Sequence, residues 1–316
     1  MTIPYGFIFQ FIQLIMALVL SPMFLGWINQ CRCWLQNRKG PGVFQPYRQL
    51  VKLFYKDAVL AENASPLFRM TPYFLFACMC LAGTIVPVLA TNLPFASVAD
   101  VIVLVGIFAL ARVFLALAAM DIGTAFGNLG ARREMMIGFL AEPALLMVLF
   151  TLAFISHSTN LTTIVDTLSH TRFIIYPSMA FAMAAYLMVL LAENSRIPVD
   201  NPSTHLELTM IHEAMMLEYS ARHLALLEWA SSIKLYDYFV IGFALFVPWG
   251  IASGSHLSSM LLAFLALFIK LAVAGFGLAL IEALSAKMRI FRVPEFLGTA
   301  FMLAVLGTLT HFLLEA

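Results

Sequence analysis

Residues 98–120, VADVIVLVGIFALARVFLALAAM, decide the fold of this 316-residue chain. About 20 consecutive apolar residues form a helix long enough to cross the hydrocarbon core of a bilayer. After Asp100, the only ionisable residue in the stretch is Arg112. The stretch therefore predicts a transmembrane helix that carries one cation in need of a partner.

Apolar segments of similar length recur along the whole chain. They lie near residues 5–27, 71–92, 135–157, 173–193, 226–250, 257–282 and 296–314. The composition is 62% hydrophobic and 11% charged, which leaves no polar segment long enough to form a soluble domain. We therefore predict an all-α polytopic membrane protein with about eight transmembrane helices, in one integral membrane domain over residues 1–316.

The sixth of these eight segments, near residues 226–250, is the least clear. Its strongly apolar part is short, so that Glu228, Lys234 and Asp237 lie on it or at its mouth. The first segment begins next to Met1 without a basic region or a small-residue cleavage site. It is therefore expected to be a transmembrane helix rather than a cleaved signal peptide.

The basic residues alternate between the predicted loops. Of the 18 Lys and Arg residues, 15 fall after the odd-numbered segments, Arg172 falls on the other side, and Arg112 and Lys270 lie within segments. The positive-inside rule then makes the loops near 28–70, 121–134, 194–225 and 283–295 cytoplasmic. Both termini are expected outside the cytoplasm, and the membrane is expected to be a prokaryotic cytoplasmic (inner) membrane.

A short amphipathic helix is predicted within the first of these loops. Residues 47–59, YRQLVKLFYKDAV, set apolar side chains against Arg48, Lys52 and Lys56. This pattern is typical of a helix that lies on the membrane surface. The preceding Gly40-Pro41-Gly42 predicts a tight basic turn.

Ionisable residues at membrane depth cost at least about 2.5–3.5 kcal/mol each, so they indicate either function or a paired structural role. Arg112, Glu142, Glu193 and Lys270 are the candidates, and Pro143 leaves polar room beside Glu142. They form either a proton relay or buried ion pairs that fix the helix register. Glu282, at a helix end, is expected to be a solvated interface residue.

Acidic residues gather in residues 191–222, LAENSRIPVDNPSTHLELTMIHEAMMLEYSAR. Because they alternate with apolar residues, the segment predicts folded, half-buried structure rather than a charged linker. His205 and His212 either join a proton chain or bond locally, and their spacing is not that of a metal site.

No catalytic signature accompanies these charges. The chain has no nucleophile–base pattern and no phosphate loop, and its two C-x-C pairs lack the second ligand pair of a zinc site. No catalytic residue, bound metal or nucleic-acid partner is therefore predicted, and whether the chain is itself an enzyme stays uncertain. A stand-alone secondary transporter is an alternative, although the two halves show no convincing repeat.

Three stretches resemble the motifs of one membrane-protein family. They are NRKGPGVFQPYRQLVKLF at residues 37–54, DIGTAFGNLGARREMMIGFLAEP at residues 121–143, and AENSRIPVDNP at residues 192–202 followed by LEYS. The family is subunit 1 of respiratory complex I together with its counterparts in energy-converting [NiFe] hydrogenases, formate hydrogenlyase subunit 4 and hydrogenase-4 component C. The resemblance extends from about Asn37 to the end of the chain.

The resemblance implies a non-catalytic subunit that anchors a cytoplasmic arm and opens a proton or sodium path into antiporter-like neighbours. It places Glu142, Glu193, Asp200, Glu207 and Glu218 in an acidic funnel, with Arg38, Arg132, Arg133 and Arg196 at its mouth or docking the arm. We add Glu213, Glu228 and Lys270 to the predicted ion path and Lys39 to the docking residues, and we predict Arg112 and Asp121 as intramembrane structural or relay residues. Partners would be hydrogenase-like large and small subunits, which would hold the [NiFe] centre and the iron–sulfur clusters.

Departures from the complex I pattern favour the hydrogenase branch. Ser203 and His205 stand where complex I members usually carry acids, and the segment from Asp200 to Glu218 is about three residues longer. The alternative is the quinone-site subunit of an NADH:quinone oxidoreductase, since a quinone chamber needs only apolar walls and a few polar contacts. Quinone is thus possible but not favoured.

Overall fold

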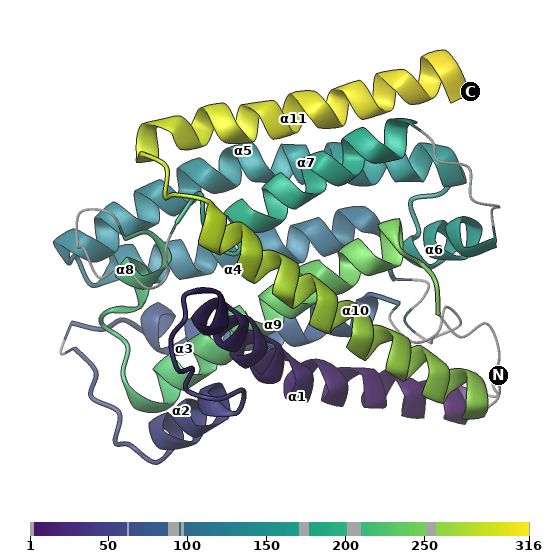
Figure 1. Ribbon diagram of the computed structural model, residues 1–316. Coiled ribbons are helices and arrows are strands. Elements are labelled where there is room, and N and C mark those ends of the chain that lie inside the picture. The colour runs from purple at the N-terminus through teal and green to yellow at the C-terminus, as the bar shows by residue number, and fades with distance from the viewer. Residues whose placement is uncertain are drawn as a thin grey trace.

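The computed structural model describes residues 3–61, 63–87, 95, 98–170, 177–200, 210–250 and 257–315 (Figure 1). Eight long helices run through these ranges: α1 (Ile3–Leu35), α3 (Pro66–Ile85), α4 (Val101–Asp121), α5 (Ala125–Ser156), α7 (Pro177–Glu193), α9 (Ala221–Phe246), α10 (Leu257–Leu284) and α11 (Val293–Thr310). Each corresponds to one predicted segment, so the all-α polytopic fold is confirmed.

By length and composition, six of the described helices can cross a membrane. The two long helices outside this set are α7, which has 17 residues, and α9, which carries Glu228, Lys234 and Asp237. Both pack inside the bundle, where their neighbours rather than lipid surround most of their side chains.

Shorter helices lie at the two ends of the bundle. Helices α2 (Gln45–Phe54) and α8 (His212–Met216) lie at one end, called here the α2–α8 end, and α6 (Leu161–His170) lies at the other (Figure 1). The start of α1 and the end of α11 are both on the α6 side, as an even number of spans requires. The one-turn helix η2 (Ile290–Arg292) precedes α11, and η3 (His311–Glu315) follows it.

The predicted amphipathic helix is confirmed as α2. Leu50 is buried while Val51 is 54% exposed, so one face of the helix meets the bundle and the other is free. The helix ends at Phe54, earlier than predicted, and Val59 instead bonds to Ser220, whose hydroxyl donates to the Val59 carbonyl at 2.6 Å.

The predicted loop at 121–134 is wrong, because most of it belongs to α5. The connection between α4 and α5 needs only three residues, since Gly123 has a φ of +77° and Thr124 is an extended N-cap. Gly127 then allows the start of α5 to lie close to the end of α4, because a Cβ at residue 127 would be only 2.6 Å from the Ala119 carbonyl oxygen. The loop predicted to start near residue 28 is also shorter than expected, since α1 continues to Leu35.

Candidate functional site

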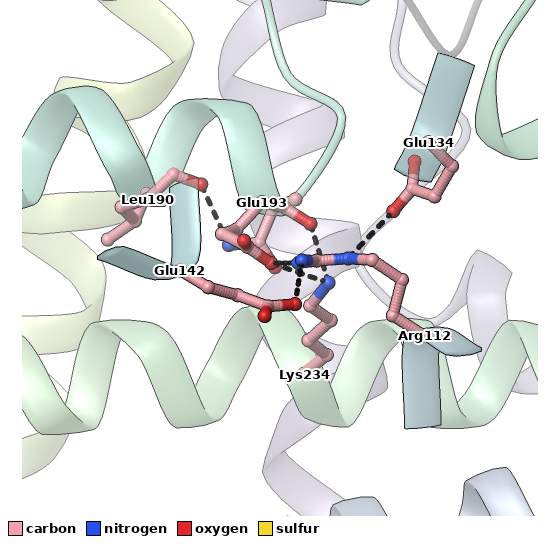
Figure 2. Close-up of polar contacts among 7 residues, drawn as sticks. Arg112, Glu134, Glu142, Leu190, Glu193 and Lys234 are labelled. Carbon is pink, nitrogen blue, oxygen red and sulfur yellow. Dashed lines mark hydrogen bonds and ion pairs between the residues drawn. The ribbon is translucent and has the colours of Figure 1, made fainter. Parts of the chain in front are cut away.

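One buried arginine is surrounded by carboxylates from two neighbouring helices (Figure 2). On α4, Arg112 is 5% exposed, and each nitrogen of its guanidinium faces a different acid. Nε lies 3.5 Å from Oε1 of Glu134, and Nη1 lies 2.5 Å from Oε1 of Glu142. Nη2 contacts Oε2 of Glu193 at the end of α7. The three acids together offset a charge that lipid could not, although Nε makes no hydrogen bond among the described residues.

A second cation reaches the same place from α9. Lys234 Nζ lies 3.1 Å from Oε2 of Glu193 and also donates to the Glu193 backbone carbonyl at 2.7 Å. We call Arg112, Lys234, Glu134, Glu142 and Glu193 the Arg112 cluster. It joins α4, α5, α7 and α9 at a point where the four helices pack together (Figure 2).

A glycine on α5 makes room for the guanidinium. Glu134, Gly138 and Glu142 follow one another at four-residue spacing, so they lie on one face of the helix. A Cβ on Gly138 would lie only 2.3 Å from Arg112 Nη1. The absence of a side chain at 138 therefore lets Arg112 sit between the acids one turn above and one turn below.

The cluster carries more acids than cations, since three carboxylates meet Arg112 and Lys234. The side chain of Glu142 is 31% exposed, against 7% for Glu134 and 1% for Glu193. Glu142 is thus the most exposed acid of the cluster.

A polar cavity opens beside the cluster at the α2–α8 end. This loop cavity has a volume of about 240 Å³, and its lining includes Arg196, Asp200, His212, Glu213 and Glu228. Its walls come from α1, α2, α8, α9 and residues 194–200. It thus collects most of the described loop residues that the sequence assigns to the ion path.

His212 separates the loop cavity from the Arg112 cluster. A small inner cavity of about 30 Å³, room for one water molecule, is lined by Arg112, Glu134, Lys234 and His212. His212 and Ser231 line both cavities. The buried Nε2 of His212 has no hydrogen-bond partner among the described residues. Burial lowers the pKa of His212, with smaller opposing effects from Glu134 and Asp200, so its imidazole is neutral at pH 7.

Two ion pairs hold residues 194–200 against the end of α10. Arg196 is buried and lies 3.1 Å from Oε1 of Glu282, while Lys287 Nζ lies 2.6 Å from Oδ1 of Asp200. Arg32 adds a longer contact to Glu282 at 3.7 Å. The expectation that Glu282 is solvated is therefore wrong: it is 5% exposed, because the loop after α7 folds back over it.

The other predicted basic residues differ in accessibility. Arg38 and Lys39, between α1 and α2, and Arg132, in the first part of α5, are exposed. Arg133 is partly buried and donates to the Met210 carbonyl at 3.1 Å, whereas Arg196 is buried in its ion pair rather than facing outward.

The remaining predicted acids lie apart from the cluster. Glu228 accepts two hydrogen bonds of 2.9 Å from the Gln49 amide of α2, and Glu218 is exposed after α8. Asp121 is an exposed residue at the end of α4 that accepts a hydrogen bond from the Ser65 amide at 3.2 Å. Glu207 lies outside the described residues.

Lys270, also assigned to the ion path, contacts carbonyl groups instead of acids. It donates to the Val247 carbonyl at 2.6 Å and to that of Trp249, just beyond the end of α9. A cation at this position complements the negative end of the α9 dipole.

Sequence reasoning misses Glu134 and leaves Lys234 without a role. It places Glu134 in a loop and assigns Lys234 only to the mouth of the sixth segment. The signal for Glu134 is the Glu-x-x-x-Gly-x-x-x-Glu spacing at 134–142, which sets two acids and a gap on one helical face.

Comparisons with known proteins agree with this architecture. A family model described as NADH dehydrogenase matches residues 9–312. Formate hydrogenlyase subunit 4 of Escherichia coli (strain K12) is 31% identical over 300 residues, which cover 95% of this chain and 97% of that protein. Hydrogenase-4 component C of the same organism is 32% identical over 303 residues, which cover 96% and 95%.

A solved structure extends the comparison to the fold. A chain in the structure of the membrane-bound sulfane sulfur reductase, an archaeal respiratory membrane complex, superposes with a TM-score of 0.85 at 18% identity. That alignment covers 96% of this chain and 98% of the other. The two chains therefore share one fold over nearly their whole lengths.

The family resemblance noted in the sequence is therefore confirmed. The family model spans nearly the whole chain, and two relatives match at 31% and 32% identity over nearly their full lengths. The chain belongs to the NADH dehydrogenase family, of the complex I subunit 1 type, and is a complex I-like membrane subunit.

Proposed function

We propose that the chain anchors a cytoplasmic arm to the membrane and forms the entrance of an ion path in a formate hydrogenlyase-type complex. Redox chemistry in the arm would drive the movement of protons or sodium ions. The [NiFe] centre and iron–sulfur clusters would belong to hydrogenase-like large and small subunits, and antiporter-like membrane subunits would continue the path. The complex would lie in a prokaryotic cytoplasmic membrane, with both termini of this chain outside the cytoplasm.

The observation that carries the proposal is the sequence of polar sites from the loop cavity inward. Asp200, Glu213 and Glu228 line the outer cavity, His212 stands between the two cavities, and Glu134 lies beyond it. A neutral imidazole can accept a proton on one nitrogen and release another from the second, which suits a relay between two wet spaces. Glu142 supports an outlet, since it is the most exposed acid of the Arg112 cluster.

The docking part of the proposal rests on exposed cations. Arg38 and Lys39 lie in the connection between α1 and α2, two helices that line the loop cavity, and Arg132 is an exposed residue in the first part of α5. A partner seated over the α2–α8 end would cover the cavity mouth, and complementary charge would fix its orientation. A redox change in that partner would then act next to the first acids of the path.

The test separates docking from ion movement. Charge reversal of Arg38 and Arg132 to Glu is expected to remove the arm from a mild-detergent purification, as read by mass spectrometry. Asp166→Lys, a reversal of an exposed charge on α6 at the opposite end, is the matched control and is expected to retain the arm.

The second arm of the test concerns the Arg112 cluster. In the assembled complex, Glu193→Gln or Glu142→Gln is expected to abolish coupled ion movement in proteoliposomes while the arm stays attached. Unchanged coupling in both variants would remove these residues from the path. Unchanged arm recovery after both charge reversals would contradict the docking surface.

A second candidate function has one observation in its favour. An almost wholly apolar cavity of about 280 Å³ lies between α1, α10 and the start of α2, lined by Trp27, Phe44 and Phe268 among others. Such a cavity suits the tail of a quinone. Quinone recovered with the purified complex, together with NADH-oxidising subunits, would favour a quinone-site subunit over the hydrogenase-type role.

A further inference from the structure

Asp237, in the middle of α9, is a buried acid outside the Arg112 cluster. It is 1% exposed, and no hydrogen bond or ion pair to it occurs among the described residues. Lys234 lies one turn before it but is held by Glu193. Asp237 is therefore not satisfied by the cation nearest to it in sequence.

The carboxyl group lies where α1, α3 and α9 meet. Its Oδ1 is 3.0 Å from the point that a Cβ on Gly83 of α3 would occupy, and the Ala17 Cβ of α1 is 3.3 Å from the same point. The glycine backbone thus leaves the space in which the carboxyl group sits. Any larger residue at 83 would press on it.

Gln13 of α1 approaches Gly83 from another side. It is 2% exposed, and its amide donates to the Gly83 carbonyl at 2.9 Å and to the Val86 carbonyl. Its Oε1 is buried and accepts no hydrogen bond from the described residues, and the same holds for Oδ2 of Asp237. Two unsatisfied buried acceptors therefore flank one glycine.

No ion pair joins Asp237 to a cation on the described part of the chain, and beside Gly83 the carboxyl group lies next to Ala17 of α1. A buried carboxylate without a counter-charge is so costly that the group takes up a proton instead.

From this geometry we infer that Asp237 and Gln13 form a proton-binding site, with the proton on the Asp237 carboxyl. A protonated carboxyl carries one O–H donor, and we assign the unsatisfied Oε1 of Gln13, which contacts the same glycine, as its acceptor. The inference does not depend on the proposed function.

Polar groups extend from this site in both directions along α1. Towards the loop cavity, the hydroxyls of Ser21 and Ser232 lie 3.4 Å apart, and Ser232 lines that cavity. On the other side, the Gln10 amide donates to the Thr84 carbonyl at 2.5 Å.

Infrared spectroscopy of the full chain in lipid tests the site directly. A protonated carboxyl gives a carbonyl-stretch band that a carboxylate lacks. We expect that band in the wild type at neutral and mildly alkaline pH, its loss in Asp237→Asn, and its retention in Glu193→Gln. Gln13→Leu is expected to shift its frequency by removing the hydrogen-bond acceptor. Isotopic labelling of aspartate in the wild type should shift the same band without any substitution.

Two results would overturn the inference. One is a wild-type spectrum in which aspartate labelling moves no protonated-carboxyl band, which would show that Asp237 is ionised. The other is loss of the band on adding sodium ions to the wild type, which would show that the site takes a metal cation. Because neither readout involves ion coupling or the arm, both are independent of the proposed function.

Discussion

Gly138→Ala tests whether the Arg112 cluster needs its present geometry, since it changes no charge. The added Cβ would lie 2.3 Å from Nη1 and 2.8 Å from Cδ of Arg112, whereas ordinary contacts begin at 3.4 Å. The guanidinium must therefore withdraw from 2.3 to at least 3.4 Å, a shift of about 1.1 Å. A shift along the Nη1–Oε1 line would lengthen the contact between Nη1 and Glu142 from 2.5 Å to about 3.6 Å, which exceeds hydrogen-bond range.

The expected cost follows from this displacement. Overpacking alone costs about 1–3 kcal/mol of unfolding free energy, and breaking a buried ion pair costs about 3–5 kcal/mol. Gly138→Ala should therefore lose between about 1 and 5 kcal/mol, depending on whether Arg112 keeps its partners. Coupled ion movement should fall as well, because the acids would no longer share one cation.

The assay pairs thermal unfolding in detergent with ion movement by the assembled complex in proteoliposomes. Gly106→Ala on α4 is the matched control, because a Cβ there meets no atom within 4 Å. It should be neutral or gain up to about 1 kcal/mol from the better helix propensity of alanine. If Gly138→Ala behaves like Gly106→Ala in both measurements, the position of Arg112 between the acids does not matter and the reasoning is refuted.

Three further predictions concern groups near the loop cavity and α9. Glu282→Ala should lower the free energy of unfolding by about 3–5 kcal/mol, because it leaves Arg196 buried without its carboxylate partner. Glu218 is exposed, so an equal loss in Glu218→Ala would contradict this pairing. Lys270→Met should lower the free energy of unfolding by about 1.5–3 kcal/mol, because it removes the hydrogen bonds to the carbonyl groups after α9, and ion coupling should persist. Lost coupling with unchanged stability would instead place Lys270 on the ion path. Because burial lowers the pKa of His212, the unfolded chain binds the extra proton first, so stability is full above about pH 6.5 and falls as the pH drops further. The melting temperature of His212→Gln should fall less over that acid range, and parallel pH profiles would show that His212 does not titrate as argued.

The spans could be predicted from sequence because length and hydropathy are local properties. Each of the eight apolar segments corresponds to a long helix, including α7, which is only 17 residues long. The helix ends were harder to place, since α5 begins about ten residues before its apolar part. Polar helical turns that lie beyond the membrane cannot be distinguished from a loop by hydropathy alone.

The ion pairs could not be predicted in the same way. The cost of burying a charge identified Arg112, Glu142 and Glu193, yet their pairing joins residues 30 and 81 positions apart in the chain. Glu282 shows the limit most clearly. Its place at a helix end suggested solvent, but Arg196 comes from a distant loop and covers it.

The position of Glu193 links the loop cavity to the Arg112 cluster. It is the last residue of α7, and the next residues are tied to α10 and to Lys287 through Arg196 and Asp200. A partner that moved this loop would therefore pull on Glu193. At an effective dielectric constant of about 20, two unit charges attract by about 4 kcal/mol at 4 Å and about 2 kcal/mol at 8 Å. Moving Glu193 away by about 4 Å would therefore weaken its attraction to Arg112 or Lys234 by about 2 kcal/mol. A change of about 1.4 kcal/mol is enough to alter a proton equilibrium tenfold. Under the proposed function, a loop movement of about 4 Å would therefore be large enough to shift a proton equilibrium in the cluster.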